Sequence, residues 1–503
     1  MARLQSITIN GWQGLDARGQ FSVSSERYGL DVPKVLRNVH LDERGRLYYP
    51  AARAELAHTF ADDIFVLRYI ERPRGILVQL HNGQVWFVKG LSGRDFDDTA
   101  GVELLTTLSQ TQWPIWSLSS SDVSYFGWGA RGGSTGSQTF RVSGTTASPV
   151  LTNISGASPD TSYSEFFKGR RFTVYQDNEV RFSNLNDYEA FEENNFFTIA
   201  GDDGGTSWDT YKGFVQGMVA WEDVLLIFLT GSVWLLTGAG PDTWNLRQAM
   251  TTVGNSAAFA LTRTERGAMS YGGENAGDPG VFLFTGQSAR KVSEMIDPLI
   301  PIDSGLDFYA TKQYDTYLLC KPTDELGVAQ VFVYDMTRDT WTTFSGWLNA
   351  AVAPSPAGLF LTSNDQLWFH DREQRYFPRH PSLGGRVKVG FYDEGAMHDL
   401  YRFVALKVTA KRLGTIASTM NVTCRIPNAE GSDPGRVVES AIEVSTDDYV
   451  TYTVPLNIRG PALEIEFFFA STANAGLLVE SMQLIYSKKG GKLARATDPG
   501  QAS

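Results

Sequence analysis

The chain has 503 residues, a hydrophobic content of 42% and a charged content of only 20%. This hydrophobic content is ample for a buried core and excludes a wholly disordered chain. The length favours two or more domains, and the formal net charge of −12 disfavours generic binding to nucleic-acid phosphates. The low charged content is expected either for a large core or for a surface that is partly covered by other subunits.

The beginning of the chain lacks the apolar run of a secretory signal peptide. The longest apolar stretch, 224–236, is interrupted by a Thr-Gly-Ser sequence, so it predicts two strands and a turn and is too short to span a bilayer. Cys320 and Cys424 form neither a CxxC pair nor a disulfide framework. We therefore expect a soluble protein without a membrane span, made in a reducing cytoplasm.

Residues 1–50 predict an N-terminal arm and a hairpin. Four glycines within the first 34 residues favour an irregular segment, and the sequence VLRNVHLDERGRLYYP at 35–50 favours two strands joined by a turn.

A short pattern recurs between residues 51 and 384. It consists of a β-branched residue, an aromatic residue, two more strand-forming residues, a small or polar residue and a glycine, as in VWFVKG at 85–90 and VWLLTG at 233–238. The residues at the second position of the seven copies are Trp86, Phe140, Arg181, Trp234, Phe282, Phe332 and Trp368. Successive residues of this series are 36 to 54 residues apart in the sequence. An internal repeat of this length is typical of stacked or radial architectures.

Each copy of the pattern follows another strand across a turn, for example at Asn82-Gly83, which is a strong hairpin signal. A further strand-like run precedes this pair, as at 64–69, and a more polar run follows it, as at 245–251. Four antiparallel strands per repeat predict an all-β protein with a β-propeller of about seven blades over 51–384. The alternative is a series of unrelated hairpins in sandwiches. No amphipathic helix of 12 residues is apparent, which disfavours an α/β fold.

We expect the propeller to be stiffened by buried aromatic side chains in the recurring strand, among them Trp86, Trp234 and Trp368. These residues occupy the same position in three of the clearer repeats.

From about residue 385 the repeat ends and longer strands with strict alternation begin. Val404, Leu406 and Val408 are expected to face one side of their strand. In the strand 462–470 the apolar residues alternate with Glu464 and Glu466. Residues 385–488 therefore predict a C-terminal β-sandwich, and residues 489–503 predict a flexible basic tail.

Two motif-like strings lack the structural context that their chemistry needs. Residues 127–132 satisfy GxGxxG and residues 132–136 satisfy GxSxG, but neither is followed by a predicted helix. The histidines show neither HxH nor HExxH spacing; they are His40, His58, His81, His370, His380 and His398. We therefore assign no catalytic, cofactor-binding or metal-binding residue and expect no enzyme activity.

Two further strings are typical of propellers in general. Residues 202–208 are close to the Asp-box of sialidase-type propellers, with one extra residue before Trp208. Residues 333–335 followed by Trp341 resemble a kelch blade that lacks the double glycine. A carbohydrate-active propeller, such as a phage-tail depolymerase, and a kelch-type adaptor therefore remain open as alternatives.

Three regions in a fixed order carry a resemblance to a known family. Gly14-Leu15-Asp16 precedes LRNVHLDERGRLYYPAA near the start, and FFKGRRFTVYQDNEVRFSN lies at 166–184 in the middle. GVFLFTGQSARKVSEMI follows at 280–296, and YTVPLNIRGPALEIEFFF and LLVESMQLIYSKKGGK lie near the end. Their order resembles the tail-hub or nozzle (stabilisation) proteins of short-tailed bacteriophages and related phage virion proteins.

The resemblance implies a structural virion protein in the phage tail, synthesised in the host cytoplasm. It implies a homo-oligomeric ring of six copies that extends the DNA channel, through which DNA passes without specific binding. The partners implied are other tail proteins, such as an adaptor, fibre or spike. The family supplies no catalytic residues, and no cofactor is expected.

Overall fold

The computed structural model describes residues 4–13, 35–49, 55–89, 101–108, 114–128, 138–155, 163–175, 178–199, 215–251, 253–273, 278–286, 288–300, 308–321, 330–352, 358–370, 378, 380, 383–391, 400–427, 437–470 and 475–489. The chain forms two compact units. One is Arg53–His380, and the other joins Met1–Ala52 to Pro381–Ser503. In sequence, the first unit is thus inserted between two segments of the second.

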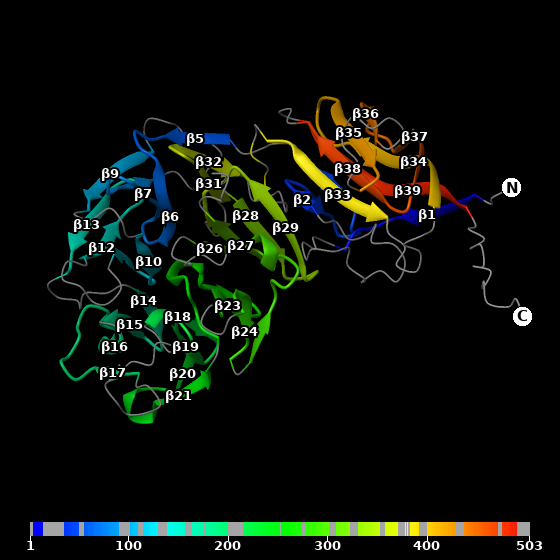
Figure 1. The fold of residues 1–503 in the computed structure, drawn as a ribbon. Coiled ribbons are helices and arrows are strands. Elements are labelled where there is room, and N and C mark those ends of the chain that lie inside the picture. The colour runs from blue at the N-terminus through cyan, green and yellow to red at the C-terminus, as the bar shows by residue number, and fades with distance from the viewer. Residues whose placement is uncertain are drawn as a thin grey trace, which may run out of the picture. The chain divides into compact units, whose positions relative to one another are not determined.

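The described residues of Arg53–His380 form seven groups of four antiparallel strands (Figure 1). From the first strand to the fourth, the first three groups are β6 (Ile64–Glu71), β7 (Arg74–Leu80), β8 (Gln84–Val88) and β9 (Val102–Thr107); β10 (Trp116–Ser119), β11 (Ser124–Trp128), β12 (Gln138–Gly144) and β13 (Pro149–Asn153); and β14 (Ser164–Phe167), β15 (Arg170–Tyr175), β16 (Glu179–Phe182) and β17 (Phe196–Thr198).

The next three groups are β18 (Val215–Trp221), β19 (Val224–Leu229), β20 (Val233–Thr237) and β21 (Asn245–Met250); β22 (Thr262–Thr264), β23 (Gly267–Gly272), β24 (Gly280–Phe284) and β25 (Ala289–Lys291); and β26 (Tyr309–Gln313), β27 (Thr316–Lys321), β28 (Gln330–Asp335) and β29 (Thr340–Ser345). Short 3-10 helices occupy Pro241–Thr243 (η1), Ala258–Ala260 (η2) and Asp297–Leu299 (η4).

The seventh group closes the ring with a strand from the other end of the unit. It contains β30 (Asn349–Val352), β31 (Leu359–Ser363) and β32 (Gln366–His370), and its fourth strand is β5 (Glu55–Thr59). β5 pairs antiparallel with β32, with Thr59 opposite Gln366. The first strands of the groups contact one another in the cyclic order β6, β10, β14, β18, β22, β26, β30 and back to β6. The prediction of a β-propeller is therefore confirmed.

The seven residues that define the sequence repeat all lie on the third strand of a blade. These strands are β8, β12, β16, β20, β24, β28 and β32. The predicted hairpin at Asn82-Gly83 joins β7 to β8, where Gly83 has a φ of 84° and its N–H bonds to the Leu80 carbonyl. A positive φ at this position favours glycine because a side chain would be strained there.

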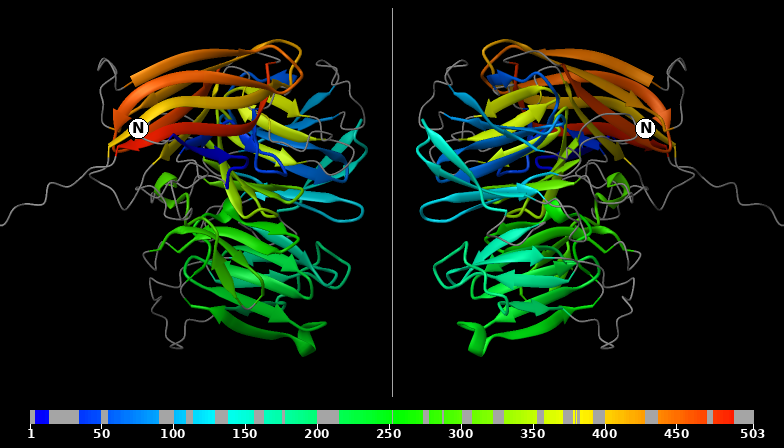
Figure 2. Two further views of the ribbon diagram at one scale, coloured as in Figure 1. Left: turned by 90° about the vertical axis from the view of Figure 1, so that its right-hand side faces the viewer. Right: turned by 90° about the vertical axis from the view of Figure 1, so that its left-hand side faces the viewer.

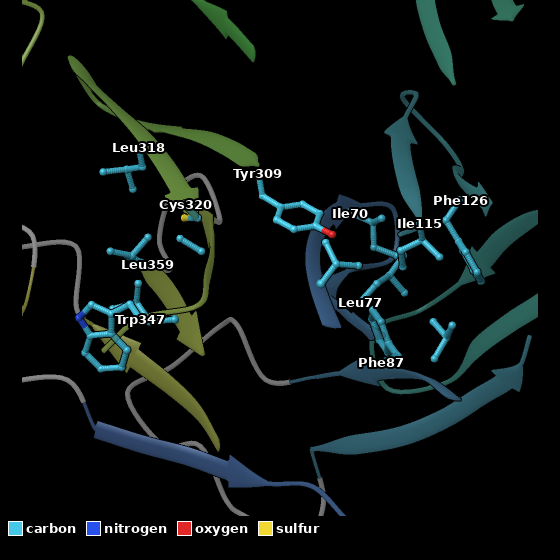
Figure 3. Close-up of a cluster of buried hydrophobic side chains, with 14 of the residues drawn as sticks. Ile70, Leu77, Phe87, Ile115, Phe126, Tyr309, Leu318, Cys320, Trp347 and Leu359 are labelled. Carbon is cyan, nitrogen blue, oxygen red and sulfur yellow. The ribbon is translucent and has the colours of Figure 1, made fainter. Parts of the chain in front are cut away.

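The three repeat tryptophans are only half-buried, which corrects the prediction made for Trp86, Trp234 and Trp368. Phe140, Phe282 and Phe332, at the same position of the pattern, are buried, so the partial exposure of the tryptophans is not a property of the third strand as such. The fully buried tryptophans lie elsewhere in the propeller, at Trp116, Trp128, Trp341 and Trp347. Apolar residues of neighbouring blades form continuous clusters between the sheets, such as the one that Figure 3 shows around Ile70, Phe87, Phe126, Leu318 and Leu359.

The other unit contains two antiparallel sheets built from both ends of the chain. One has the order β3 (His40–Leu41), β4 (Leu47–Tyr49), β39 (Leu477–Lys489), β34 (Leu400–Arg412) and β37 (Val450–Gly460), and β1 (Gln5–Ile9) also pairs with β39. The second has the order β2 (Val35–Arg37), β33 (Gly385–Phe391), β38 (Leu463–Phe469), β35 (Ser418–Arg425) and β36 (Val437–Val444). Figure 2 shows the long strands of this unit, coloured orange to red, running side by side.

Aromatic side chains join these two sheets. The rings of Tyr49 and Phe469 stack with their centroids 5.0 Å apart, and Phe391 lies 5.2 Å from Tyr401. At Gly385 a Cβ atom would lie 2.7 Å from the Tyr49 ring, so only glycine fits this close approach.

The N-terminal segment belongs to the same sheets as the C-terminal strands and is not a separate arm and hairpin. After β2, Asn38 adopts a φ of 55°, and the chain passes from one sheet to the other. Only β3 and β4 pair as a hairpin, whereas β2 pairs with β33. The sequence shows the turn, but it does not show which sheet each short strand joins.

The alternation predicted for β38 is present: Leu463, Ile465, Phe467 and Phe469 are buried. In β34 the prediction is wrong at one residue. A register shift between Phe403 and Ala405 leaves Val404 half-buried, while Phe403, Leu406 and Val408 are buried. A β-bulge adds one residue to the strand, so the faces exchange across it.

Replacing Trp341 by alanine should destabilise the propeller more than replacing Trp86. The Trp341 ring stacks on Tyr334, and its Nε1 donates to the Val292 carbonyl at 2.7 Å, which links two neighbouring blades. We expect Trp341→Ala to lower the free energy of unfolding by about 3–5 kcal/mol, and Trp86→Ala by about 1–2 kcal/mol. Urea denaturation measures both, and equal losses would contradict this difference in packing.

A charge on the buried side of β5 should open the ring. Ala57 packs in an apolar cluster with Ile64, Leu80 and Phe360, so Ala57→Asp would bury an unpaired carboxylate. We expect a loss of at least about 3 kcal/mol in the free energy of unfolding. Thr59→Asp, on the exposed side of the same strand, is the matched control and should cost less than about 1 kcal/mol. Similar losses for the two variants would show that β5 does not close the propeller.

Candidate functional site

The motif-like strings of the sequence do not assemble into a site within the described residues. Gly127 and Trp128 end strand β11, and the rest of the GxGxxG and GxSxG strings, 129–136, lies outside the described residues. The near-Asp-box at 202–208 also lies outside them.

The histidines are dispersed. His40 lies in β3, His58 in β5, His81 in the turn after β7 and His370 at the end of β32, while His380 packs against Trp347. His398 lies outside the described residues. No group of three or more His, Cys, Asp or Glu side chains suited to a metal ion occurs in the part of the chain that the structure describes. Cys320 and Cys424 are both buried and free.

A cavity of about 220 Å³ opens among the innermost strands of the propeller. Its walls come from the first strands of several blades, from η2 and from the residue before β14. The polar part of the lining includes Arg68, Ser117, Tyr163, Thr262 and Thr311. The apolar part includes Leu67, Phe259, Leu261, Ala310, Ala350 and Ala351. The lining combines one cation with hydroxyl groups and apolar surface, which is a composition typical of ligand pockets.

Arg68, on β6, is the charged residue of this lining. Its Nε donates to the Ile115 carbonyl at 2.9 Å, and its Nη1 donates to the Leu67 carbonyl at 3.1 Å. Its guanidinium carbon lies 5.1 Å from the centroid of the Phe259 ring and 5.9 Å from that of Tyr309. Figure 3 shows Tyr309 between the side chains of Cys320 and Ile70. These contacts fix the position of the guanidinium.

Glu165, on β14, is a second ionisable group on an innermost strand. Its Oε1 accepts the Phe166 N–H at 2.9 Å, and the nearby Ala220 N–H also favours the charged carboxylate. Burial raises the pKa of Glu165 to about 7, against the lowering effect of these N–H groups and of Arg263. The carboxyl group can therefore gain or lose a proton near neutral pH.

Sequence reasoning did not identify Arg68 or Glu165. Both lie in first strands, where the repeat pattern is weakest, and neither belongs to a motif with fixed spacing. A charged residue next to apolar residues of a short strand, Arg68 in IFVLRYIE and Glu165 in SEFF, was the available signal. Such a residue is expected at the axis of a propeller, because the innermost strands border a central space.

Comparison with protein-family models and with curated proteins gives no match. Among solved structures, the WD40 domain of Pan2 from Neurospora crassa matches 66% of this chain and 99% of its own chain. The sequence identity is 11% and the TM-score is 0.40. None of the helices in the described residues is long and apolar enough to cross a membrane.

The raised pKa of Glu165 should make stability depend on pH. Between pH 4.5 and about 7 the folded protein retains a proton on Glu165 that the unfolded chain has released, so the free energy of unfolding falls as pH rises. Glu165→Gln removes this effect. The free energy of unfolding of Glu165→Gln minus that of the native protein should therefore increase by up to about 3 kcal/mol from pH 4 to pH 8.

Chemical denaturation at a series of pH values measures this gain. Glu222→Gln, in the exposed turn between β18 and β19, is the control for removing one negative charge. An increase for Glu165→Gln that is no larger than the increase for Glu222→Gln would contradict a raised pKa of Glu165.

Proposed function

We propose that the protein is a structural subunit of a phage tail, in a homo-oligomeric hub or nozzle ring. The order of the sequence regions named above supports this proposal, since they resemble that virion family. The main structural support for the proposal is the uneven distribution of exposed apolar residues on the outer strands of the propeller. A subunit of a ring needs such a surface, because specific assembly buries apolar side chains between copies.

Four neighbouring blades each expose a large apolar residue on the outermost strand. These are Leu56 on β5, Leu104 on β9, Val150 on β13 and Phe196 on β17, with exposed fractions between 43% and 52%. We call these four residues the apolar rim. Large apolar residues on exposed edge strands are a hazard for aggregation unless a partner covers them.

The outer strands of the next two blades differ. β21 exposes Asn245 and Arg247, and β25 exposes Ala289 and Arg290. The propeller therefore has one apolar and one polar stretch of rim, as expected when one side contacts a neighbouring copy and the other does not. Other tail proteins, such as an adaptor, fibre or spike, would dock on further surfaces of the ring.

The closed propeller is suited to a mechanical role. Its strands are tied into a ring by backbone hydrogen bonds between β5 and β32, and apolar clusters fill the space between blades. The net charge of −12 favours a channel that DNA traverses without adhering to it.

Charges on the apolar rim should prevent assembly without unfolding the protein. We expect the double variant Leu104→Asp and Val150→Asp to weaken self-association by about a hundredfold or more, because each carboxylate would have to be buried in the interface. Light scattering after size-exclusion chromatography measures the mass of the assembly, and thermal denaturation reports folding.

Arg247→Asp, which also introduces a negative charge on an outer strand, is the control and should assemble normally. A native protein that stays monomeric at high concentration and never joins virions would refute the proposal. If that monomer also released reducing ends from host polysaccharide, the carbohydrate-active alternative would replace it.

A further inference from the structure

The charge of Arg68 is not balanced by a carboxylate among the described residues. Its hydrogen bonds go to two backbone carbonyls, and no described acid forms an ion pair with it. Nη2 has no described acceptor at all. The groups that act electrostatically on Arg68 are Tyr309, Tyr163 and Cys320, which are uncharged at neutral pH.

Glu165 does not serve as the counter-ion of Arg68. The cation that acts on its carboxyl group is Arg263, on β22, whereas Arg68 is not among the groups that influence it. Burial lowers the pKa of Arg68, but a guanidinium remains protonated in proteins. The propeller thus keeps a permanent cation at the edge of a cavity, and a cation that is partly removed from water favours the binding of an anion.

The Arg68 side chain is also preorganised for binding a ligand. Two backbone carbonyls fix Nε and Nη1, and the rings of Phe259 and Tyr309 lie beside the guanidinium. An arginine fixed in this way loses little conformational entropy when its free N–H groups bind an oxyanion. Nη2 carries the N–H groups that are still available, and they can donate to an oxygen of a carboxylate or phosphate.

The rest of the lining indicates which kind of anion fits. Phe259 and Ala310, which are only half-buried, offer apolar surface, while Ser117, Thr262 and Thr311 offer hydroxyl groups. Inorganic phosphate would leave the apolar surface uncovered, whereas a molecule with a compact apolar body and one carboxylate would contact both parts. A volume of about 220 Å³ restricts the ligand to a small molecule.

We propose that the axial cavity of the propeller binds a small organic carboxylate, whose oxygens accept hydrogen bonds from Arg68 and whose apolar body contacts the innermost strands. This site is independent of the apolar rim. Its assignment does not depend on the role of the protein in a phage tail.

Isothermal titration calorimetry of the full chain in a carboxylate-free buffer tests the proposal. The probes are benzoate, N-acetylglycine, which carries the carboxylate of a peptide end, the neutral analogue benzamide, and inorganic phosphate. We expect one benzoate or N-acetylglycine per chain and binding of benzamide that is weaker by about tenfold or more. Absence of binding by both carboxylates, equal binding of benzamide, or binding of phosphate alone would each overturn the proposal.

Three variants locate the site. Arg68→Gln removes the cation and should weaken benzoate binding by about tenfold or more. Ala310→Leu keeps the cation but fills part of the cavity, so it should weaken binding to a similar degree even if Arg68→Gln proves unstable. Arg170→Gln is the control, because Arg170 also lies over aromatic rings and donates to a backbone carbonyl, but outside the cavity.

The control should bind benzoate like the native protein. Benzoate binding that persists unchanged in folded Arg68→Gln and Ala310→Leu would place the ligand elsewhere and refute the assignment.

Discussion

The pairing of β5 with β32 is the interaction on which the propeller depends. Without it, the seventh blade would have three strands and an open edge, and the first and last blades would be joined by side-chain packing and a few isolated hydrogen bonds, such as that from the Ile64 N–H to the Asn364 carbonyl. Closing the ring with a strand from the opposite end of the unit joins the two ends of the repeat array through backbone hydrogen bonds. The apolar clusters between blades then act as one continuous core, because each sheet is packed on both faces.

This closed ring presents two regions of different chemistry. The outer strands of four blades carry the apolar rim, which suits contact with another protein surface. The inner strands carry Arg68, which lines a cavity, and Glu165, whose pKa is raised to about 7. The same four-stranded sheet supplies both regions: the first strand of a blade faces the axis and the fourth strand faces outwards. A small ligand at the inner strands and a protein partner at the outer strands would therefore not compete for the same surface.

The sequence was sufficient to predict the propeller but not its finer packing. Seven pattern residues from Trp86 to Trp368 fall on the third strands because strand-forming residues and turn glycines recur together, which is a local signal. The closing strand was missed because its partner lies some three hundred residues away, from Thr59 to Gln366. Val404 was assigned to the wrong face because a bulge alters the count of residues without changing their type. Arg68 became recognisable only when its backbone acceptors and the adjacent cavity were seen together.

The order of strands along the chain has a consequence for synthesis on the ribosome. β1 to β5 emerge first, but β5 needs β32, while β1 and β4 need β39 and β2 needs β33. The propeller cannot close until β32, which ends at His370, has been translated, and the other unit cannot complete its sheets until β39, which ends at Lys489, has been translated. The early strands therefore keep unpaired edges until then, and a chain that ended before β32 would lack both a closed ring and complete sheets in the second unit. A chain that ended between β32 and β39 could close the propeller but would leave β1 and β4 without their partner strand in the second unit.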